Sequence, residues 1–387
     1  MTGRIIWLVL LMICLNVCAA EGAAADNLIS RELFDTLGIE AINREVEAIN
    51  RDLALDLSPL TLDMLRQIAE NGISLEIEVW LTMLRRMFFD EIAVQMHLLG
   101  KVLLLAVFCV LMQQLHSSFR SSEIAMLSYS VCFIFLLVIG MSAFSSAVML
   151  AENTIDAMIG FMESLLPLLL FLLTAVGAPV SAAMVTPLML FAVNVLGVLM
   201  KTVVLPLFLL SAVLGSLDYF SAAYRLGQLS SLLRQAGMVI SGFGMMLFTG
   251  LTAVQGITGG IADGLGIRTA KFAVGNLVPI VGKLFADSVD VIFGASLILK
   301  NALGMFGVIT IGAVCLVPLI KLLVLAFLMK AGGAVIQPMG EERLAGCLSQ
   351  LGTHILLLFA VVALTAFLFF LTITIIVGIG SMSVMMR

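Results

Sequence analysis

The segment GTHILLLFAVVALTAFLFFLTITIIVGI, residues 352–379, decides the fold class of this chain. Its 28 residues include no aspartate, glutamate, lysine or arginine. An α-helix crosses the hydrocarbon core of a bilayer with about 20 predominantly apolar residues, so this segment is long enough to span one. Its apolar residues form a continuous run, without the alternation of a β-barrel strand, and therefore predict a transmembrane helix.

Similar apolar segments recur along the chain. Apolar residues make up 61% of the 387 residues and charged residues only 12%, against about half and a quarter in soluble domains. We therefore expect an all-α, polytopic helical membrane protein with about six to eight spans. The segments that meet at Lys201 form either a tight hairpin or one long kinked element. Besides 352–379, the candidate spans are 98–117, 124–150, 157–176, 182–200, 202–217, 236–256 and 303–329. The segments 182–200 and 202–217 are the two that meet at Lys201.

The N-terminus has the order of an export signal. One basic residue in MTGR precedes the apolar stretch IIWLVLLMICLNVCAA, and small residues follow in AAEGAAAD. This order predicts a secretory signal peptide over residues 1–25, cleaved after Ala25. The alternative is an uncleaved signal anchor. In both cases the segment that follows begins outside the cytoplasm.

Residues 26–96 form an acidic segment with a helical pattern. Between Asp26 and Gly100 the chain has 14 acidic and 6 basic residues, a balance that disfavours nucleic-acid binding. Ile42, Val46, Ile49 and Leu53 recur at helical spacing and predict one apolar stripe on a helix. We expect a small extracytoplasmic helical segment. It is either a docking surface for partners and sister subunits or a cap on the chain's own membrane domain.

The remaining residues, 97–387, are expected to form the polytopic membrane domain. Basic residues cluster in three of the predicted loops, and cytoplasmic loops carry an excess of lysine and arginine. Placing all three loops in the cytoplasm also leaves the acidic segment outside the cell membrane, in agreement with the export signal. The basic residues are Arg120 in the first loop, Arg225 and Arg234 in the second, and Lys330 and Arg343 in the third.

Some charged residues lie within the predicted spans. A charge at the bilayer centre costs roughly 2.5 to 3.5 kcal/mol on insertion scales, so it usually faces protein or water. Glu163 and Lys321 are the candidates for a polar pathway, with snorkelling to the membrane surface as the alternative. Lys201 and Lys330 are better explained by snorkelling or by the edge of a span.

The glycine-rich stretch GITGGIADGLGIRTAKFAVGNLVPIVGKLFADSVD occupies residues 256–290. Lys283 and Asp287 have the spacing of an ion pair on one helix face. Pro279 and the glycines predict a broken helix, which membranes tolerate only where protein or water satisfies the backbone. Residues 256–301 are therefore either a re-entrant or interfacial element or an amphipathic surface loop. Gly256, Gly260 and Gly264 are spaced four residues apart, which places them on one helix face and suits close packing against another helix.

No motif for an enzyme, a cofactor or a metal is present in the sequence. The glycine-rich stretch lacks the Gly-Lys-Ser/Thr of a P-loop and the spacing of a dinucleotide fingerprint. Ser296 has no convincing histidine partner, because His97, His116 and His354 are scattered at the edges of spans. The sequence predicts a protein without catalytic residues, cofactors or metal ligands.

Three sequence blocks, two of them charged, resemble the signature region of the stage III sporulation protein AE family. They are Arg268-Thr-Ala-Lys271-Phe272, Pro279-Ile-Val-Gly282, and Ser296-Leu-Ile-Leu-Lys300-Asn301-Ala302 before Gly304. The order of signal, acidic segment and spans is also similar to that family along the whole chain. The polar residues here that we assign to a pathway or to packing are Arg268, Lys271, Lys283, Asp287, Lys300 and Asn301.

The resemblance implies a function in endospore-forming bacteria. Members of that family are multi-pass proteins of the mother-cell membrane around the forespore, in a channel or secretion-like assembly with an ATPase, ring-forming proteins and small membrane subunits. We expect this chain to be a non-enzymatic gate or scaffold of that assembly. We expect it to contact membrane lipid, and it is a candidate homo-oligomer. The alternative is an autonomous small-molecule permease with Glu163, Lys321 and residues 256–301 around a polar site.

Overall fold

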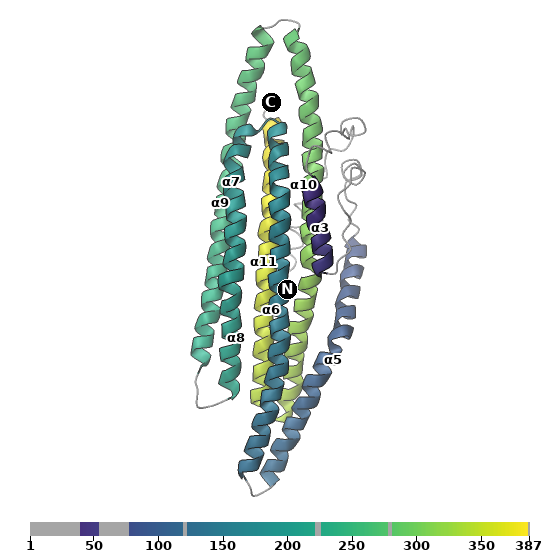
Figure 1. Ribbon diagram of the computed structural model, residues 1–387, viewed down its shortest axis with the longest axis vertical. Coiled ribbons are helices and arrows are strands. Elements are labelled where there is room, and N and C mark those ends of the chain that lie inside the picture. The colour runs from purple at the N-terminus through teal and green to yellow at the C-terminus, as the bar shows by residue number, and fades with distance from the viewer. Residues whose placement is uncertain (1–38, 54–76, 119–121, 221–225, 278–280, 386–387) are drawn as a thin grey trace.

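The protein is an elongated bundle of long helices (Figure 1). The computed structural model describes residues 39–53, 77–118, 122–220, 226–277 and 281–385, apart from some side chains within them. The helices are α3 (Ile39–Leu53), α5 (Ile77–Ser118), α6 (Ser122–Ala175), α7 (Pro179–Leu199), the π-helix η1 (Met200–Val204), α8 (Leu205–Phe220), α9 (Gly227–Leu277), α10 (Val281–Ile336), the 3-10 helix η2 (Gln337–Met339) and α11 (Glu342–Met385). The predicted signal peptide lies outside the described residues.

Six helical segments in the described part of the chain are long and apolar enough to cross a membrane. The predicted helical membrane class is therefore confirmed, at the lower end of the expected six to eight spans. The helices are longer than one crossing needs. The 54 residues of α6 extend over roughly 81 Å at 1.5 Å per residue, whereas the hydrocarbon core is about 30 Å thick.

The prediction of separate spans at 124–150 and 157–176 is wrong, because α6 contains both. The charged residues around Asp156 interrupt the apolar run, but they are compatible with helical backbone and do not end the helix. At Lys201 the structure favours the long element over the hairpin. There α7 continues into α8 through η1, and an inserted π-turn of this kind deforms a helix without ending it.

Successive long helices run in opposite directions along the bundle (Figure 1). The last residues of α5, α8 and α10 and the first residues of α6, α9 and α11 consequently lie at the same end of the bundle. This arrangement agrees with the prediction that the three basic loops share one side of the membrane. That this side is the cytoplasm stays a prediction.

The turn between α6 and α7 is built by a glycine and a proline. Gly177 has a φ of 91°, a left-handed conformation that glycine adopts without a Cβ penalty. Its amide donates to the Thr174 carbonyl at 2.9 Å and the Ala178 amide donates to the Leu173 carbonyl at 3.1 Å, which is a Schellman motif. Pro179 then starts α7, at the position where its missing N–H costs nothing.

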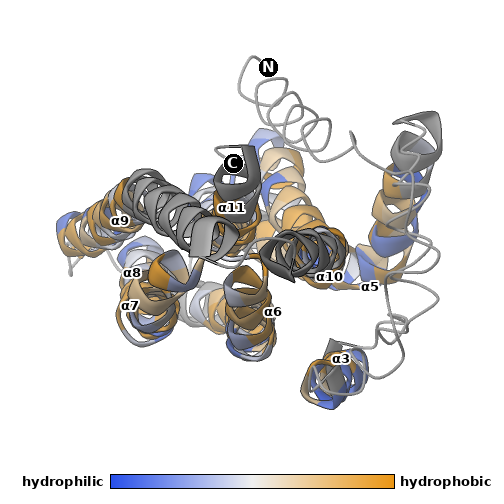
Figure 2. Ribbon diagram, turned by 90° about the horizontal axis from the view of Figure 1, so that it is seen from above, coloured by the Kyte–Doolittle hydropathy of each residue, from blue (hydrophilic) through white to orange (hydrophobic). Residues whose placement is uncertain are grey.

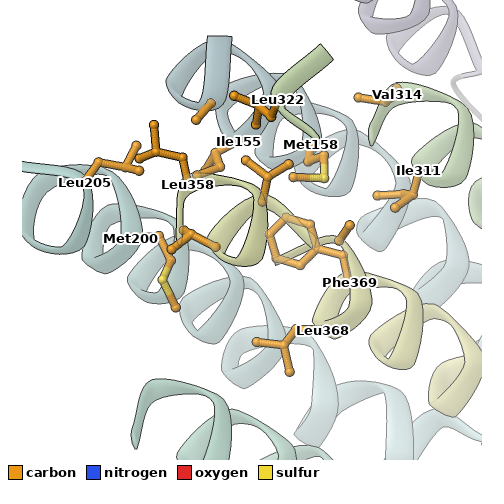
Figure 3. Close-up of a cluster of buried hydrophobic side chains, with 14 of the residues drawn as sticks. Ile155, Met158, Met200, Leu205, Ile311, Val314, Leu322, Leu358, Leu368 and Phe369 are labelled. Atoms are coloured by element: carbon orange, nitrogen blue, oxygen red, sulfur yellow. The ribbon is translucent and has the colours of Figure 1, made fainter. Parts of the chain in front are cut away.

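The centre of the bundle is filled by side chains from α6, η1, α8, α10 and α11. Figure 3 shows part of this cluster, in which Met158, Met200, Leu322 and Phe369 are buried. Lipid is as apolar as these side chains, so within a membrane such packing stabilises through close contact more than through water release. The most extensive helix pair, α10 with α11, supplies a large part of this core.

The acidic segment contributes a helix that docks on the membrane domain. Ile42, Val46 and Ile49 of α3 are at most 1% exposed, and α3 packs against α6. For this helix the structure favours the cap over a free docking surface, because its predicted apolar stripe is already covered. The predicted boundary between residues 96 and 97 falls within α5, which runs through it unbroken.

The glycines of the 256–290 stretch do not break α9. The helix continues through Gly256, Gly260 and Gly264 as far as Leu277, and α10 begins at Val281. The upper ends of α9 and α10 extend past those of α7 and α11 (Figure 1). Residues 278–280, with Pro279, lie outside the described part, and the re-entrant element at 256–301 stays a prediction.

Candidate functional site

One face of α6 changes from apolar to polar along its length. Towards the start of the helix this face exposes large apolar side chains, including Val131, Phe135 and Val138. Between Ser142 and Glu163 the exposed residues of the same face are polar except for Met149, which is 59% exposed. Their spacing of three, four or seven residues keeps them on one side of a helix. This polar face of α6 consists of Ser142, Ser146, Asn153, Asp156 and Glu163.

Two contacts fix the register between α6 and the neighbouring α7–η1 element. Lys201 Nζ lies 2.6 Å from Asp156 Oδ2, and Gly197 lies against the Ile159 side chain. Because the two elements run in opposite directions, residues 153–163 of α6 lie beside residues 194–204 of α7 and η1.

At this height α6 exposes carboxylates, whereas α7 and η1 expose valines together with the uncharged Asn194 and Thr202, whose side chains donate to carbonyls of their own helix. Val195, Val198 and Val203 are 47%, 56% and 37% exposed, as suits contact with lipid. Asn153 and Glu163 are exposed on α6 at the same height. Depth in the membrane alone therefore does not explain the polarity of α6. The polar face of α6 meets an environment different from that of α7.

The ion pair of Asp156 and Lys201 is accessible to solvent, with side chains 47% and 41% exposed. Lys201 belongs to η1, and π-turns inside helices frequently occur at functional sites. Glu152 and Glu163 lie on the same helix as Asp156, one and two turns away. Carboxylates therefore outnumber the single ammonium group, and a face of this charge favours cations over anions.

A second polar cluster is buried where α8, α9 and α11 meet. Ser211 Oγ lies 2.9 Å from His354 Nε2, and it donates to the Ser230 carbonyl in an alternative bond of 2.7 Å. Ser230 Oγ donates to the Ser211 carbonyl at 2.7 Å. Gln350 approaches closely because Gly215 has no side chain there.

The backbone partner determines the tautomer of His354. His354 Nδ1 lies 3.0 Å from the Gln350 carbonyl, which can only accept a hydrogen bond, so Nδ1 carries the proton and Nε2 accepts from Ser211. A serine donating to a histidine is also the arrangement of a hydrolytic dyad. Ser211 and His354 are at most 1% exposed, and we interpret the cluster as a joint between helices.

Lys300 of the third signature block lies between α10 and α11. Its side chain is fully buried, and Nζ donates to the Val377 carbonyl at 2.8 Å. One turn later Gly304 lies against the Val377 side chain, so the two helices approach closely here. Asn301 is half-buried, and its Oδ1 has no hydrogen-bond partner among the described atoms. This geometry supports packing for Lys300, while a polar pathway stays a prediction.

The other predicted residues are not gathered at one site by the contacts that the structure describes. Glu163 lies on the polar face of α6, whereas Lys321 is half-buried on α10, and among the described residues no ion pair joins them. The predicted packing glycines lie on the backbone of α9 and are Gly256, Gly260 and Gly264. The following charged residues lie on the backbone of α9 and α10, with side chains outside the described part: Arg268, Lys271, Lys283 and Asp287.

Sequence reasoning missed both polar clusters. Lys201 was assigned to snorkelling, although its partner Asp156 lies in the preceding apolar element. The signal for the α6 face was the three-four-seven spacing of polar residues between two apolar stretches. The joint of Ser211, Ser230 and His354 left no such signal, because its members lie up to 143 residues apart.

Comparison with known proteins places the chain in a family. The family model for stage III sporulation protein AE matches residues 61–380. The stage III sporulation protein AE of Bacillus subtilis (strain 168) is 36% identical over 308 residues, which cover 80% of this chain and 77% of that relative. No solved structure matches the chain. With a family match over most of its length and a relative of this identity, the chain belongs to the stage III sporulation protein AE family.

Proposed function

We propose that this protein is a non-enzymatic membrane component of the channel or secretion-like assembly between mother cell and forespore. We further propose that the polar face of α6 lines a water-filled passage in that assembly. The family match supports a function in sporulation. The proposed place is the mother-cell membrane around the forespore, with the acidic segment outside the cytoplasm, and the partners are the other stage III sporulation proteins.

The single observation that supports the passage is the contrast between α6 and α7 at one height. If lipid surrounded both helices, Asp156 and Glu163 would face hydrocarbon, where a charge costs roughly 2.5 to 3.5 kcal/mol. If water surrounded both, Val195, Val198 and Val203 would form an apolar strip in water. A passage on the α6 side and lipid on the α7 side satisfies both sets of residues.

Cysteine labelling at matched heights tests this proposal. Asn153→Cys and Val203→Cys, which lie beside each other in this register, are introduced separately and treated in sporulating cells with a water-soluble, membrane-impermeant maleimide. The native Cys109, Cys132 and Cys347 are buried, and the unmodified chain gives the background. We expect labelling at Asn153→Cys at least fivefold above labelling at Val203→Cys.

Either of two results contradicts the passage. Equal strong labelling would show that this height lies in bulk water, and no labelling of Asn153→Cys above the background would show that no water reaches α6. A functional measurement accompanies the labelling. Asp156→Lys places two cations together, and we expect fewer heat-resistant spores than with Asp156→Glu, which keeps the charge.

An autonomous permease is the second candidate function. The buried joint of Ser211, Ser230 and His354 is polar and lies inside the bundle, as a substrate site would. Its hydrogen bonds, however, are made largely among its own members. Solute flux through liposomes that contain only the purified chain would favour the permease, whereas an inert chain that co-purifies with other stage III proteins favours the assembly component.

A further inference from the structure

Helix α3 covers the middle of the polar face of α6. Gly160 lies one turn from both Asp156 and Glu163, and the Glu45 side chain of α3 packs against it. A Cβ at position 160 would overlap the Glu45 carboxylate, so the absence of a side chain at Gly160 lets α3 approach. Seen along the bundle, α3 lies at its outer edge (Figure 2).

The outer side of α3 is charged. Glu40, Arg44, Glu47 and Arg51 are all exposed, and they point away from the stripe of Ile42, Val46 and Ile49 that docks on α6. A helix with this outer side cannot face hydrocarbon at acceptable cost. The space in front of Gly160 is therefore aqueous. The charged outer side of α3 thus supports the water-filled passage independently of the residues on α6 and α7.

The attachment of α3 to α6 is small. The helix has 15 residues, and its described large apolar contacts are the three side chains of the stripe. Isolated helices of this length are marginal in water, so α3 depends on its docking site for order. Such an element can leave its site when another surface or a change in the assembly competes for it.

We propose that α3 is an intramolecular plug, which covers the polar face of α6 at Gly160 and must leave it for the passage to work. The proposal rests on the proposed function of that face. The family model begins at residue 61, beyond α3, so the plug is a property argued for this chain from its own contacts. Docked α3 narrows the passage, and released α3 uncovers Gly160.

A disulfide that locks α3 in place tests the plug. Glu45→Cys with Gly160→Cys places one thiol on each side of the contact, where a disulfide forms once the two Cβ atoms come within about 4.5 Å. The variant is the sole copy of the protein in sporulating cells. Non-reducing gels give the cross-linked fraction, and heat-resistant spore counts give function. We expect at least a tenfold loss of spores when most of the chain is cross-linked, and recovery with an added thiol reductant.

The single variants Glu45→Cys and Gly160→Cys are the controls, and neither can form this cross-link. Full cross-linking with undiminished spore counts would show that α3 is a fixed cap and would overturn the plug. Failure of the two cysteines to cross-link under an oxidant would overturn the docked geometry itself. In both cases the labelling of Asn153→Cys still tests the proposed passage separately.

A second measurement releases α3. Val46→Asp places a charge in the docked stripe, whereas Glu47→Ala changes the exposed side and serves as the matched control. In a chain with Glu45→Ala and Gly160→Cys, we expect Val46→Asp to raise maleimide labelling of the new thiol at least threefold and Glu47→Ala to leave it unchanged. Unchanged labelling in Val46→Asp would contradict a helix that can be released.

Discussion

Lys201 Nζ lies 2.6 Å from Asp156 Oδ2, and this ion pair ties the π-helix η1 to the middle of α6. The two residues are 45 positions apart in the sequence. The pair joins elements whose apolar runs suggest burial in lipid, yet both side chains are accessible. In the passage that we propose, it marks the height at which α6 turns a polar face away from the lipid.

Exchanging the two charges should preserve the pair. An exposed ion pair contributes about 0.2 to 1 kcal/mol, so we expect Asp156→Lys with Lys201→Asp to retain near-normal stability and spore counts, and each single change to lower the spore counts. Thermal unfolding in lipid nanodiscs and heat-resistant spore counts measure the two effects. A loss of several kcal/mol in Asp156→Ala with Lys201→Ala would contradict a water-facing pair.

The neighbouring serines Ser230 and Ser231 should differ in their effect on stability. Ser230 exchanges hydrogen bonds with Ser211 across α8 and α9, and removing one partner of a buried bond costs about 1 to 3 kcal/mol. Ser231 Oγ bonds only to the Gln228 carbonyl of its own helix. We expect Ser230→Ala to lower the unfolding temperature in nanodiscs and Ser231→Ala to leave it nearly unchanged. Equal effects would argue against the joint.

Two glycines of α10 provide a matched test of helix packing. A Cβ at Gly304 would overlap the Val377 side chain of α11, whereas nothing lies within 4 Å of a Cβ at Gly312. Overpacking of this kind costs about 1 to 3 kcal/mol. We therefore expect Gly304→Ala to reduce folded protein in the membrane and Gly312→Ala to have little effect, as measured by protease resistance of α10 and α11.

Variants of Lys300 separate packing from function. Lys300→Met keeps most of the shape of the buried stem and removes the ammonium group that donates to the Val377 carbonyl. Replacing a buried charge by an apolar side chain of similar volume is often neutral, so we expect near-normal folding. Lys300→Glu should reduce folded protein strongly, because it buries a carboxylate against a carbonyl oxygen.

Spore counts of the Lys300→Met variant then distinguish the two interpretations of this residue. Normal counts would assign Lys300 to packing between α10 and α11. A tenfold loss of spores with unchanged folding would assign it to a polar pathway.

Much of the fold was accessible from the sequence. The uncharged run of 352–379 predicts a membrane-spanning helix, and α11 contains it. The stripe of Ile42, Val46 and Ile49 predicts one buried helix face, which α3 has. These predictions succeed because hydrophobicity and its period act locally, through what each backbone segment must bury.

Predictions failed where a local pattern did not decide the continuity of a helix. Asp156 interrupts hydropathy without breaking α6, and the glycines of 256–264 are accommodated within α9. Hydropathy reports which residues prefer lipid, but a helix ends only where its backbone hydrogen bonds end. The helices therefore extend beyond the span limits that were drawn from charge positions.

The amino-acid sequence by itself determined the class of this protein, the family to which it belongs and the face that α3 buries. The tertiary structure decided which polar residues meet, namely Asp156 with Lys201 and Ser211 with His354, and that Glu45 packs against Gly160. Composition and periodicity describe one element at a time. Contacts between elements depend on the register and the close approach of helices that are distant in the sequence, and only the packed bundle sets those.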